Sequence, residues 1–287
     1  MTDNAAGAEA DHRVHAGPAT DPQAMHEYYE LGQELGRLAS SPQGELEFER
    51  SCEILLRALP RAPAVVADIG GGPGRYALWL AGLGYRVRHR DVVPLHVRQV
   101  SEAAGPGGAI ESRLADARSL DLADASVDAV LLLGPLYHLE RAGDRVQALR
   151  EAGRVVRPGG VVFAAAISRW SARLDGVLRQ RFDVEHPQMT AMVSRSERTG
   201  VLEPLFPGSF TAYTHRPEEL RHEVQAAGLE VTDLVCVEGG AFLLKDLAER
   251  KADPREWLVV LQTARALERV PELLGVGPHL LVTARRS

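Results

Sequence analysis

The sequence predicts an α/β fold, a doubly wound parallel sheet covered by helices on both faces. Short apolar runs alternate with helical patterns from residue 64 to residue 167, and the alternation returns near the C-terminus. This pattern is typical of strand–helix–strand units with right-handed crossovers. The composition is 45% hydrophobic and 25% charged, as in a globular chain with a sizeable core.

The chain opens with a segment that has neither helical nor strand periodicity. Residues 1–21 are rich in Ala, Gly, Asp and Pro, so we expect a disordered leader there. Residues 22–62 then show two helical patterns, with Tyr28 and Leu38 on the apolar face of the first and residues 44–60 forming the second. These helices are expected to form an N-terminal cap.

The main domain is expected to consist of residues 63–168 and 214–287. Its strands are predicted at residues 64–69, 85–91, 109–114, 127–133, 161–167, 231–238 and 279–286. Its helices are predicted at residues 74–83, 94–104, 145–156 and 254–269, with another after residue 215.

The alternation stops between the two parts of this domain. Residues 169–213 contain broken helical patterns and Pro/Gly turns. A structureless loop of that length is rare in a compact domain, so we predict an inserted helical lid. A lid can enclose a small molecule and exclude water, which favours a small-molecule substrate. The net charge of -6 disfavours nucleic acid as a partner.

Several other classes of protein are disfavoured. Cys52 and Cys236 lie far apart in apolar runs, so neither a metal site nor a disulfide framework is predicted. The N-terminus has no basic start followed by an apolar core, and no apolar stretch approaches about 20 residues. We therefore expect a cytoplasmic protein without a membrane partner.

The most informative stretch is VVADIGGGPGRYA, residues 65–77. A glycine-rich turn between a strand and a helix lets the backbone approach a ligand and aims helix N-terminal amides at it. Gly72, Gly74 and Ala77 fit the G-x-G-x-x-A pattern of nucleotide-binding turns. Asp91, at the end of the next predicted strand, is placed to bind ribose hydroxyls. NAD and S-adenosylmethionine both carry adenosine, so these residues do not separate the two cofactors.

Two further acidic residues favour S-adenosylmethionine. Asp68 ends the first predicted strand beside the glycines, where it would repel a pyrophosphate but accept the ammonium group of an amino-acid tail. Asp116 and Ala117 follow the third predicted strand, where the acid can accept a hydrogen bond from the adenine amino group.

At this point the chain resembles the class I S-adenosylmethionine-dependent methyltransferases of the small-molecule type. The similarity is close over residues 64–166 and looser beyond them, and it lies in the motifs VVADIGGGPGRYA, RVRHRD, LADAR, DAVLLLGPLYHL and RVVRPGGVVFAA. It implies a Rossmann-like sheet of seven strands with one antiparallel late strand. It also implies methyl transfer from S-adenosylmethionine, with S-adenosyl-L-homocysteine as product. Together with the predicted lid, we expect a small-molecule O, N or C nucleophile as acceptor, in specialised metabolism.

The resemblance further implies a set of cofactor-binding residues. Four of them would surround the methionine moiety: Asp68, Gly70, Gly72 and Gly74. Asp91 would bind the ribose, Asp116 and Ala117 the adenine, and Gly134 would line the methyl-donor cleft.

The acceptor side is expected after the strand at residues 127–133, because ligands of open α/β sheets bind beyond the carboxyl ends of the strands. His138 is a candidate general base, since its reference pKa is close to neutral. The alternative is that His138 orients the loop while Tyr137 packs on the cofactor. Many methyl transfers need only alignment of the reacting atoms.

Four other residues are weaker candidates. His215 follows the predicted lid and either enters the site or simply starts a helix. Tyr28 and Tyr29 either fold over the cofactor, offering aromatic faces to the sulfonium, or pack in the core. Arg169 either meets an anionic substrate or is solvated.

Two other functions remain open at this point. An NAD(P)-dependent oxidoreductase would need a proton donor at the nicotinamide, and the sequence contains no Tyr-x-x-x-Lys pair. A non-catalytic S-adenosylmethionine-binding partner protein would keep the same cofactor motifs.

Overall fold

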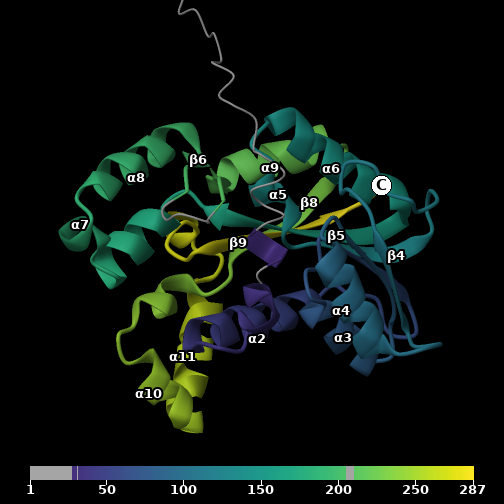
Figure 1. Cartoon of the computed structure of the whole chain (residues 1–287), viewed down its shortest axis with the longest axis horizontal. Coiled ribbons are helices and arrows are strands. Elements are labelled where there is room, and N and C mark those ends of the chain that lie inside the picture. Colours follow the sequence, from purple (N-terminus) through teal and green to yellow (C-terminus); the bar gives the residue numbers. More distant parts are fainter. Residues whose placement is uncertain (1–27, 31, 205–209) are drawn as a thin grey trace, which may run out of the picture.

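The structure is a computed structural model that describes residues 28–30, 32–204 and 210–287. The leader predicted at residues 1–21 lies outside these ranges. A twisted sheet runs through the centre of the molecule (Figure 1). Its main strands, in spatial order, are β3 (Ile110–Leu114), β2 (Arg86–Asp91), β1 (Val65–Ile69), β4 (Val127–Leu132), β5 (Val156–Ser168), β9 (His279–Arg285) and β8 (Glu230–Cys236).

The strand directions confirm the predicted sheet. Strands β1 to β5 pair in parallel, whereas β9 pairs antiparallel with both β5 and β8. Because β1 to β5 are parallel, the loops after β1, β2, β3 and β4 all lie at the C-terminal ends of the strands. Ligands of open parallel sheets bind beyond these ends.

Helices cover both faces of the sheet because the strands present apolar side chains on both faces. Figure 1 shows α6 and α9 on one side, and α2, α3 and α4 on the other. The helices are α2 (Pro42–Leu56), α3 (Arg75–Gly82), α4 (Pro94–Ala104), α5 (Pro135–His138), α6 (Ala142–Val155), α9 (Pro217–Ala226), α10 (Leu247–Ala252) and α11 (Pro254–Leu267). Short 3-10 turns are η3 (Gly239–Leu243) and η4 (Pro271–Leu273). None of the helices in the described ranges is long and apolar enough to cross a membrane.

The two faces form separate cores. Ala67 and Val130 face a cluster with α6 and α9, while their neighbours Val66 and Leu131 face a cluster with α2 and α3. This period-2 alternation is what a sheet buried on both faces requires.

Two predicted elements differ from the structure. The single helix predicted before residue 40 is interrupted, because Gly32 adopts a left-handed φ of 71° and a 3-10 turn, η1 (Gln33–Gly36), follows it. The strand β5 begins at Val156 rather than at residue 161. The pairing register of β5 with β4 shifts just after this start, so the RPGG turn is absorbed into the strand.

The segment predicted as a lid contains helices and a short hairpin. Its elements are η2 (Ala172–Arg179, a π-helix), α7 (Phe182–Glu185), α8 (Gln188–Thr199), β6 (Val201–Leu202) and β7 (Ala212–His215). Strand β7 pairs antiparallel with β6 and parallel with the end of β5, which anchors the hairpin to the sheet. Helices α7 and α8 extend beyond the end of the sheet (Figure 1).

An ion-pair network ties the N-terminal segment to the sheet. His279 Nδ1 lies 2.5 Å from a carboxylate oxygen of Glu238 and 3.9 Å from one of Glu47, while Arg37 donates to both oxygens of Glu47. Burial alone would lower the pKa of His279, but the two carboxylates raise it to about 9. The ligand atoms of Glu47, Glu238 and His279 lie within 4.8 Å of one another, as a metal site would require, but Glu47 already pairs with Arg37 and Glu238 with His279.

We predict that this network makes stability fall at alkaline pH. The folded pKa of His279 is raised, so its stabilisation is complete below the unfolded value of about 6.5 and is lost as pH rises through about 9. Urea unfolding between about pH 7 and about pH 10 should show a larger loss of unfolding free energy in the wild type than in His279→Gln. His222→Gln, at an exposed position, is the control. Parallel pH curves for wild type and His279→Gln would contradict the prediction.

Candidate active site

A cavity of about 1080 Å³ opens at the C-terminal ends of the parallel strands. Single small-molecule sites usually have about 300–1,000 Å³, so this cavity can hold a cofactor together with a second molecule. Most of the residues predicted from the sequence line it: Tyr29, Asp68, Gly70, Gly72, Asp91, Asp116, Ala117, Gly134, Tyr137 and His138. Four do not: Tyr28, Gly74, Arg169 and His215.

The glycine loop after β1 is shaped by close packing. Gly70 has a φ of 63°, and a Cβ there would lie 2.6 Å from Cγ of Pro135. Gly72 has a φ of 57° and lines the cavity. Both positions therefore need glycine for the backbone to reach the ligand space.

Gly74 has a different role from the predicted one. Its φ is 87°, and a Cβ would lie 2.5 Å from Cγ2 of Val100 on α4. The position serves the close approach of α3 to α4 and does not face the cavity.

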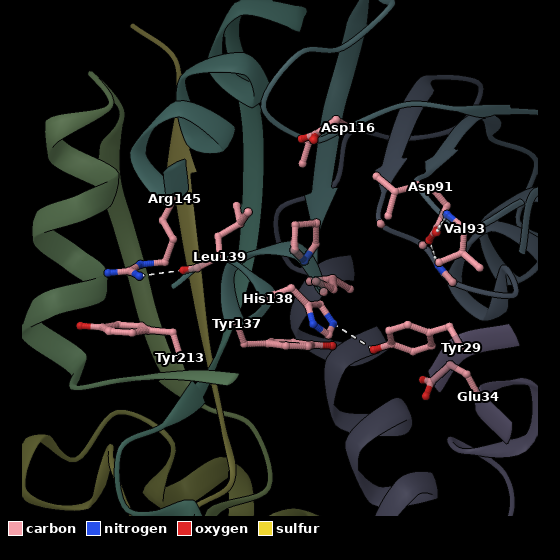
Figure 2. Close-up of a pocket in the computed structure, with 18 of the residues that line it drawn as sticks. Tyr29, Glu34, Asp91, Val93, Asp116, Tyr137, His138, Leu139, Arg145 and Tyr213 are labelled. Carbon is pink, nitrogen blue, oxygen red and sulfur yellow. Dashed lines mark hydrogen bonds between the residues drawn. The ribbon is translucent and has the colours of Figure 1, made fainter. Parts of the chain in front are cut away.

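The Asp91 carboxylate organises the loop. One oxygen accepts the N–H of Gly72 at 2.8 Å, and the other accepts the N–H of Val93 at 2.8 Å (Figure 2). The second oxygen also lies 3.2 Å from His96 Nδ1. Burial alone would raise the pKa of Asp91, but these hydrogen bonds, the one from His96 foremost, hold it below its usual value. Asp91 is therefore ionised at neutral pH.

His89, which sequence reasoning missed, supports the loop from beneath. Its Nε2 lies 3.0 Å from the carbonyl oxygen of Gly72, and its Nδ1 lies 2.8 Å from the Ser112 hydroxyl. Burial lowers the pKa of His89 to about 4, so the ring is neutral. The carbonyl can only accept, so we assign the proton to Nε2. The one signal for His89 in the sequence was the presence of a histidine within the predicted strand RVRHRD.

Asp68 has the opposite environment to Asp91. It is 1% exposed, and one of its oxygens has no hydrogen-bond partner among the described residues. A Cβ on Gly71 would lie 2.5 Å from that oxygen, so the carboxylate lies directly against the loop. Burial, and then the charge of Asp91, raise the pKa of Asp68 to about 7. A buried carboxylate oxygen without a partner among the described residues, in a ligand cavity, fits an ammonium group.

Asp116 and Ala117 line the cavity after β3. The Asp116 carboxylate accepts the backbone N–H of Arg118 at 2.8 Å and a guanidinium N–H of the same residue at 2.6 Å. These bonds lower the pKa of Asp116. Contact between Asp116 and an adenine stays a prediction.

An aromatic cluster surrounds His138. The hydroxyl of Tyr29 lies 2.9 Å from His138 Nε2 (Figure 2), and the rings of Tyr137 and Phe210 each have centroids 4.6 Å from the imidazole. Burial lowers the pKa of His138 to about 4 and raises that of Tyr29 well above its usual value. Tyr29 therefore stays protonated and His138 neutral, with Nε2 already engaged. Tyr28 packs edge-on against Tyr29 and Phe210 outside the cavity lining.

The far end of the cavity is built around Arg145, another residue that the sequence did not reveal. Arg145 is 1% exposed and donates to the carbonyl oxygens of Leu139 and Glu140, at 2.8 Å and 2.7 Å. It also pairs with the Glu223 carboxylate at 2.6 Å and stacks on the Tyr213 ring, 3.5 Å from the ring centroid. Figure 2 shows this stack on the other side of the cavity from Tyr29. Arg145 thus connects the loop after His138 to α9 and to the β6–β7 hairpin.

Two residues that were predicted to belong to the site instead pair with other groups of the protein. His215 is completely buried and does not line the cavity; its Nε2 lies 3.1 Å from Glu223 in the last turn of α9. Arg169 is 2% exposed, pairs with Glu219 and donates to the carbonyl oxygen of Thr214. Both hold the hairpin and α9 on the end of β5, which corrects the expectation that either meets the substrate.

Comparison with known proteins identifies the central domain. The methyltransferase domain family matches residues 67–164, which run from β1 into β5. The chain is 35% identical over 139 residues to a malonyl-[acyl-carrier protein] O-methyltransferase of Pseudescherichia vulneris, covering 48% of this chain and 53% of that protein. It is 37% identical over 106 residues to a ubiquinone biosynthesis O-methyltransferase of Methylocella silvestris, covering 36% and 40%. The chain thus spans about half or less of the length of these relatives.

Solved structures share the fold over most of the chain. A SAM-dependent methyltransferase from Methanosarcina mazei has a TM-score of 0.55 at 20% identity, covering 81% of this chain and 96% of its own. The [4+2]-cyclase SpnF has a TM-score of 0.59 at 18% identity, covering 94% and 98%. Residues 67–164 therefore form a methyltransferase domain, and the chain has the Rossmann-like fold of the class I S-adenosylmethionine-dependent enzymes.

We predict that binding of S-adenosylhomocysteine depends on the ionisation of Asp68. A protonated Asp68 cannot pair with the ammonium group, so the affinity should be about tenfold lower at pH 6 than at pH 8. The variant Asp68→Asn should bind more weakly throughout and lose this pH dependence. Isothermal titration calorimetry of both proteins across this range tests the assignment. The same pH slope in Asp68→Asn would exclude Asp68 as its origin.

Proposed function

We propose that the protein transfers a methyl group from S-adenosylmethionine to a small-molecule O, N or C nucleophile by in-line displacement. The observation that carries this proposal is the buried Asp68 carboxylate against the glycine loop, one oxygen of which has no partner among the described residues. A pyrophosphate would be repelled there, whereas the ammonium group of an amino-acid tail would be stabilised. The same carboxylate argues against an NAD(P)-dependent oxidoreductase.

Different residues of the cavity would bind different parts of the cofactor. Asp68 would hold the ammonium group, Asp91 the ribose, and Asp116 with Ala117 the adenine. Gly70, Gly72 and Gly134 would offer close backbone contacts. A Cβ would clash with Pro135 at Gly70 and crowd the Gly70 carbonyl oxygen at Gly134, whereas Gly72 needs glycine for its left-handed φ. When bound, S-adenosylmethionine supplies a methyl group already activated by the sulfonium.

The acceptor would occupy the rest of the cavity. This part is lined by the start of α6, the end of α8 and the hairpin, through Arg141, Arg145, Thr199, Val201, Thr211 and Tyr213. A pocket walled by the inserted segment suits a small molecule enclosed from water. The printed names of the relatives include O- and C-methyltransferases, so they support no single acceptor atom for this chain.

His138 would orient the acceptor rather than act as a strong base. Its pKa of about 4 makes it a weak proton acceptor, and Tyr29 engages its Nε2. Alignment of nucleophile, methyl carbon and sulfur would then supply most of the rate enhancement.

We predict that cofactor binding stabilises the protein selectively. S-adenosylmethionine or S-adenosylhomocysteine at about 100 times Kd should raise Tm by about 5 °C, whereas NAD should leave it unchanged. Asp91→Ala should abolish the shift, because it removes the carboxylate that shapes the loop. Thermal-shift measurements with the three ligands test this. Stabilisation by NAD alone would overturn the proposed function.

We predict separate effects on turnover and on cofactor binding at His138. Label transfer from methyl-labelled S-adenosylmethionine to a panel of phenols, carboxylic acids, amines and acidic carbon compounds identifies an acceptor. With it, His138→Ala should lower kcat by about tenfold while Kd for S-adenosylhomocysteine changes by less than about twofold.

The variant Tyr29→Phe tests whether His138 acts by orienting the acceptor or as a base. It removes only the hydroxyl bonded to the imidazole, so it should also lower kcat if His138 acts by orientation. An unchanged kcat in His138→Ala would remove this residue from the mechanism. Cofactor binding without transfer to any acceptor would favour a non-catalytic partner protein.

A further inference from the structure

We propose that the hydroxyl of Tyr137 binds the methyl-accepting atom, and that this atom is an oxygen that reacts as its anion: a carboxylate, a phenolate or an enolate. The inference rests on the proposed methyl transfer and narrows its acceptor from an O, N or C nucleophile to an ionised oxygen. It follows from the position of one unpartnered hydroxyl in the cavity and from the chemistry of the groups around it.

Tyr137 lies in α5, directly after the loop that follows β4. A Cβ on Gly134, the N-cap of this helix, would lie 3.0 Å from the carbonyl oxygen of Gly70 and 3.6 Å from the Tyr137 hydroxyl. Gly70 and Gly134 follow the neighbouring parallel strands β1 and β4. The hydroxyl therefore lies where these two loops meet, beside the part of the cavity assigned above to the cofactor.

The Tyr137 hydroxyl has no hydrogen-bond partner among the described residues, and it is open to the cavity that Tyr137 lines. The polar atoms beside it differ. The Tyr29 hydroxyl is bonded to Nε2 of His138, and Nδ1 of His138 is enclosed, with no partner in the described part of the chain. The Tyr137 ring packs on the imidazole, and Figure 2 shows its hydroxyl end directed towards Tyr29 and away from Tyr213. The ring is thus held while its hydroxyl is left for a ligand.

The three side chains at this point offer no base at neutral pH. Burial lowers the pKa of His138 to about 4, and burial raises the pKa of Tyr137 and of Tyr29 above the usual value of a phenol. An acceptor that had to lose a proton here would find no group to take it. An acceptor that is already ionised needs none.

The charged groups near the Tyr137 hydroxyl leave room for an anion. They are Arg37, Glu34, Glu47 and Asp91. Glu34 and Glu47 both accept from Arg37, and Asp91 accepts backbone N–H groups of the two loops described above. These donors reduce the repulsion that the carboxylates exert. The protonated phenol then donates to the acceptor, and hydrogen bonds to an ionised group are roughly twice as strong as neutral ones.

The lone pairs of the acceptor favour oxygen over nitrogen and carbon. An ionised oxygen can accept the O–H of Tyr137 with one lone pair and attack with another. An aliphatic amine arrives as an ammonium ion, which has no lone pair until a base removes a proton. In the transfer, an oxygen lone pair forms the new C–O bond and the electron pair of the broken S–C bond stays on sulfur. No proton leaves in this step.

A pair of matched variants isolates the hydroxyl. Tyr137→Phe removes it and keeps the ring that packs on His138. Tyr85→Phe is the control, because Tyr85 lies outside the cavity lining and donates its hydroxyl to the carbonyl oxygen of Pro60. We expect Kd for S-adenosylhomocysteine to change by less than about twofold in both variants, which calorimetry checks.

Absorbance titration of 4-nitrophenol bound to the complex with S-adenosylhomocysteine tests the contact without turnover. Loss of one hydrogen bond to the phenolate should raise the pKa of the bound probe by about 1 in Tyr137→Phe, relative to the wild type. Tyr85→Phe should leave it unchanged. The same bound pKa in Tyr137→Phe and in the wild type would overturn the proposal.

Label transfer to benzoic acid, 4-nitrophenol, benzylamine and acetylacetone, with the products analysed by NMR, locates the methylated atom. We expect the methyl group on oxygen, a rate–pH profile whose midpoint follows the pKa of the acceptor, and a kcat about tenfold lower in Tyr137→Phe. Methylation of the benzylamine nitrogen or of the acetylacetone carbon would contradict the assignment. Failure of the wild type to bind S-adenosylhomocysteine at all would instead refute the proposed function, so the two failures are distinguishable.

Discussion

The cavity depends on one buried carboxylate, that of Asp91. It accepts backbone N–H groups from the loop after β1 and from the turn before α4, together with the imidazole of His96. One side chain at the end of β2 thus fixes two loops that would otherwise have unpaired amides. Because these bonds stabilise the charged form, Asp91 keeps its charge at neutral pH despite burial.

The hydrogen bonds that Asp91 accepts give it a different role from Asp68. Asp91 is largely satisfied by the protein, whereas Asp68 keeps a buried oxygen without a partner among the described residues. Repulsion from Asp91 adds to the effect of burial and raises the pKa of Asp68 to about 7. A cationic ligand group would relieve both effects. The fixed charge of Asp91 therefore makes full ionisation of Asp68 at neutral pH depend on a cationic partner.

The sequence predicted the parts of the site that depend on local patterns. The buried strands, the glycine turn and the acids at strand ends follow from periodicity and spacing, and the structure places Asp68, Asp91 and Asp116 around one cavity. The break at Gly32 was missed because a glycine is tolerated within a helical pattern.

The remaining residues were hidden because their roles depend on distant partners. Arg145 acquires its role from Glu223 and Tyr213, which lie far along the chain. The sequence could not decide the place of His215 for the same reason, since its hydrogen-bond partner is Glu223, eight residues further along the chain. His96 resembles any polar residue on a helix until its contact with Asp91 is known.

The most direct test is a crystal structure of the protein with S-adenosylhomocysteine. The account predicts the ammonium nitrogen about 3 Å from the Asp68 carboxylate, the ribose at Asp91 and the adenine beside Ala117. The amino-acid end lying instead at Arg145 and Tyr213, with Asp68 still unpaired, would contradict it.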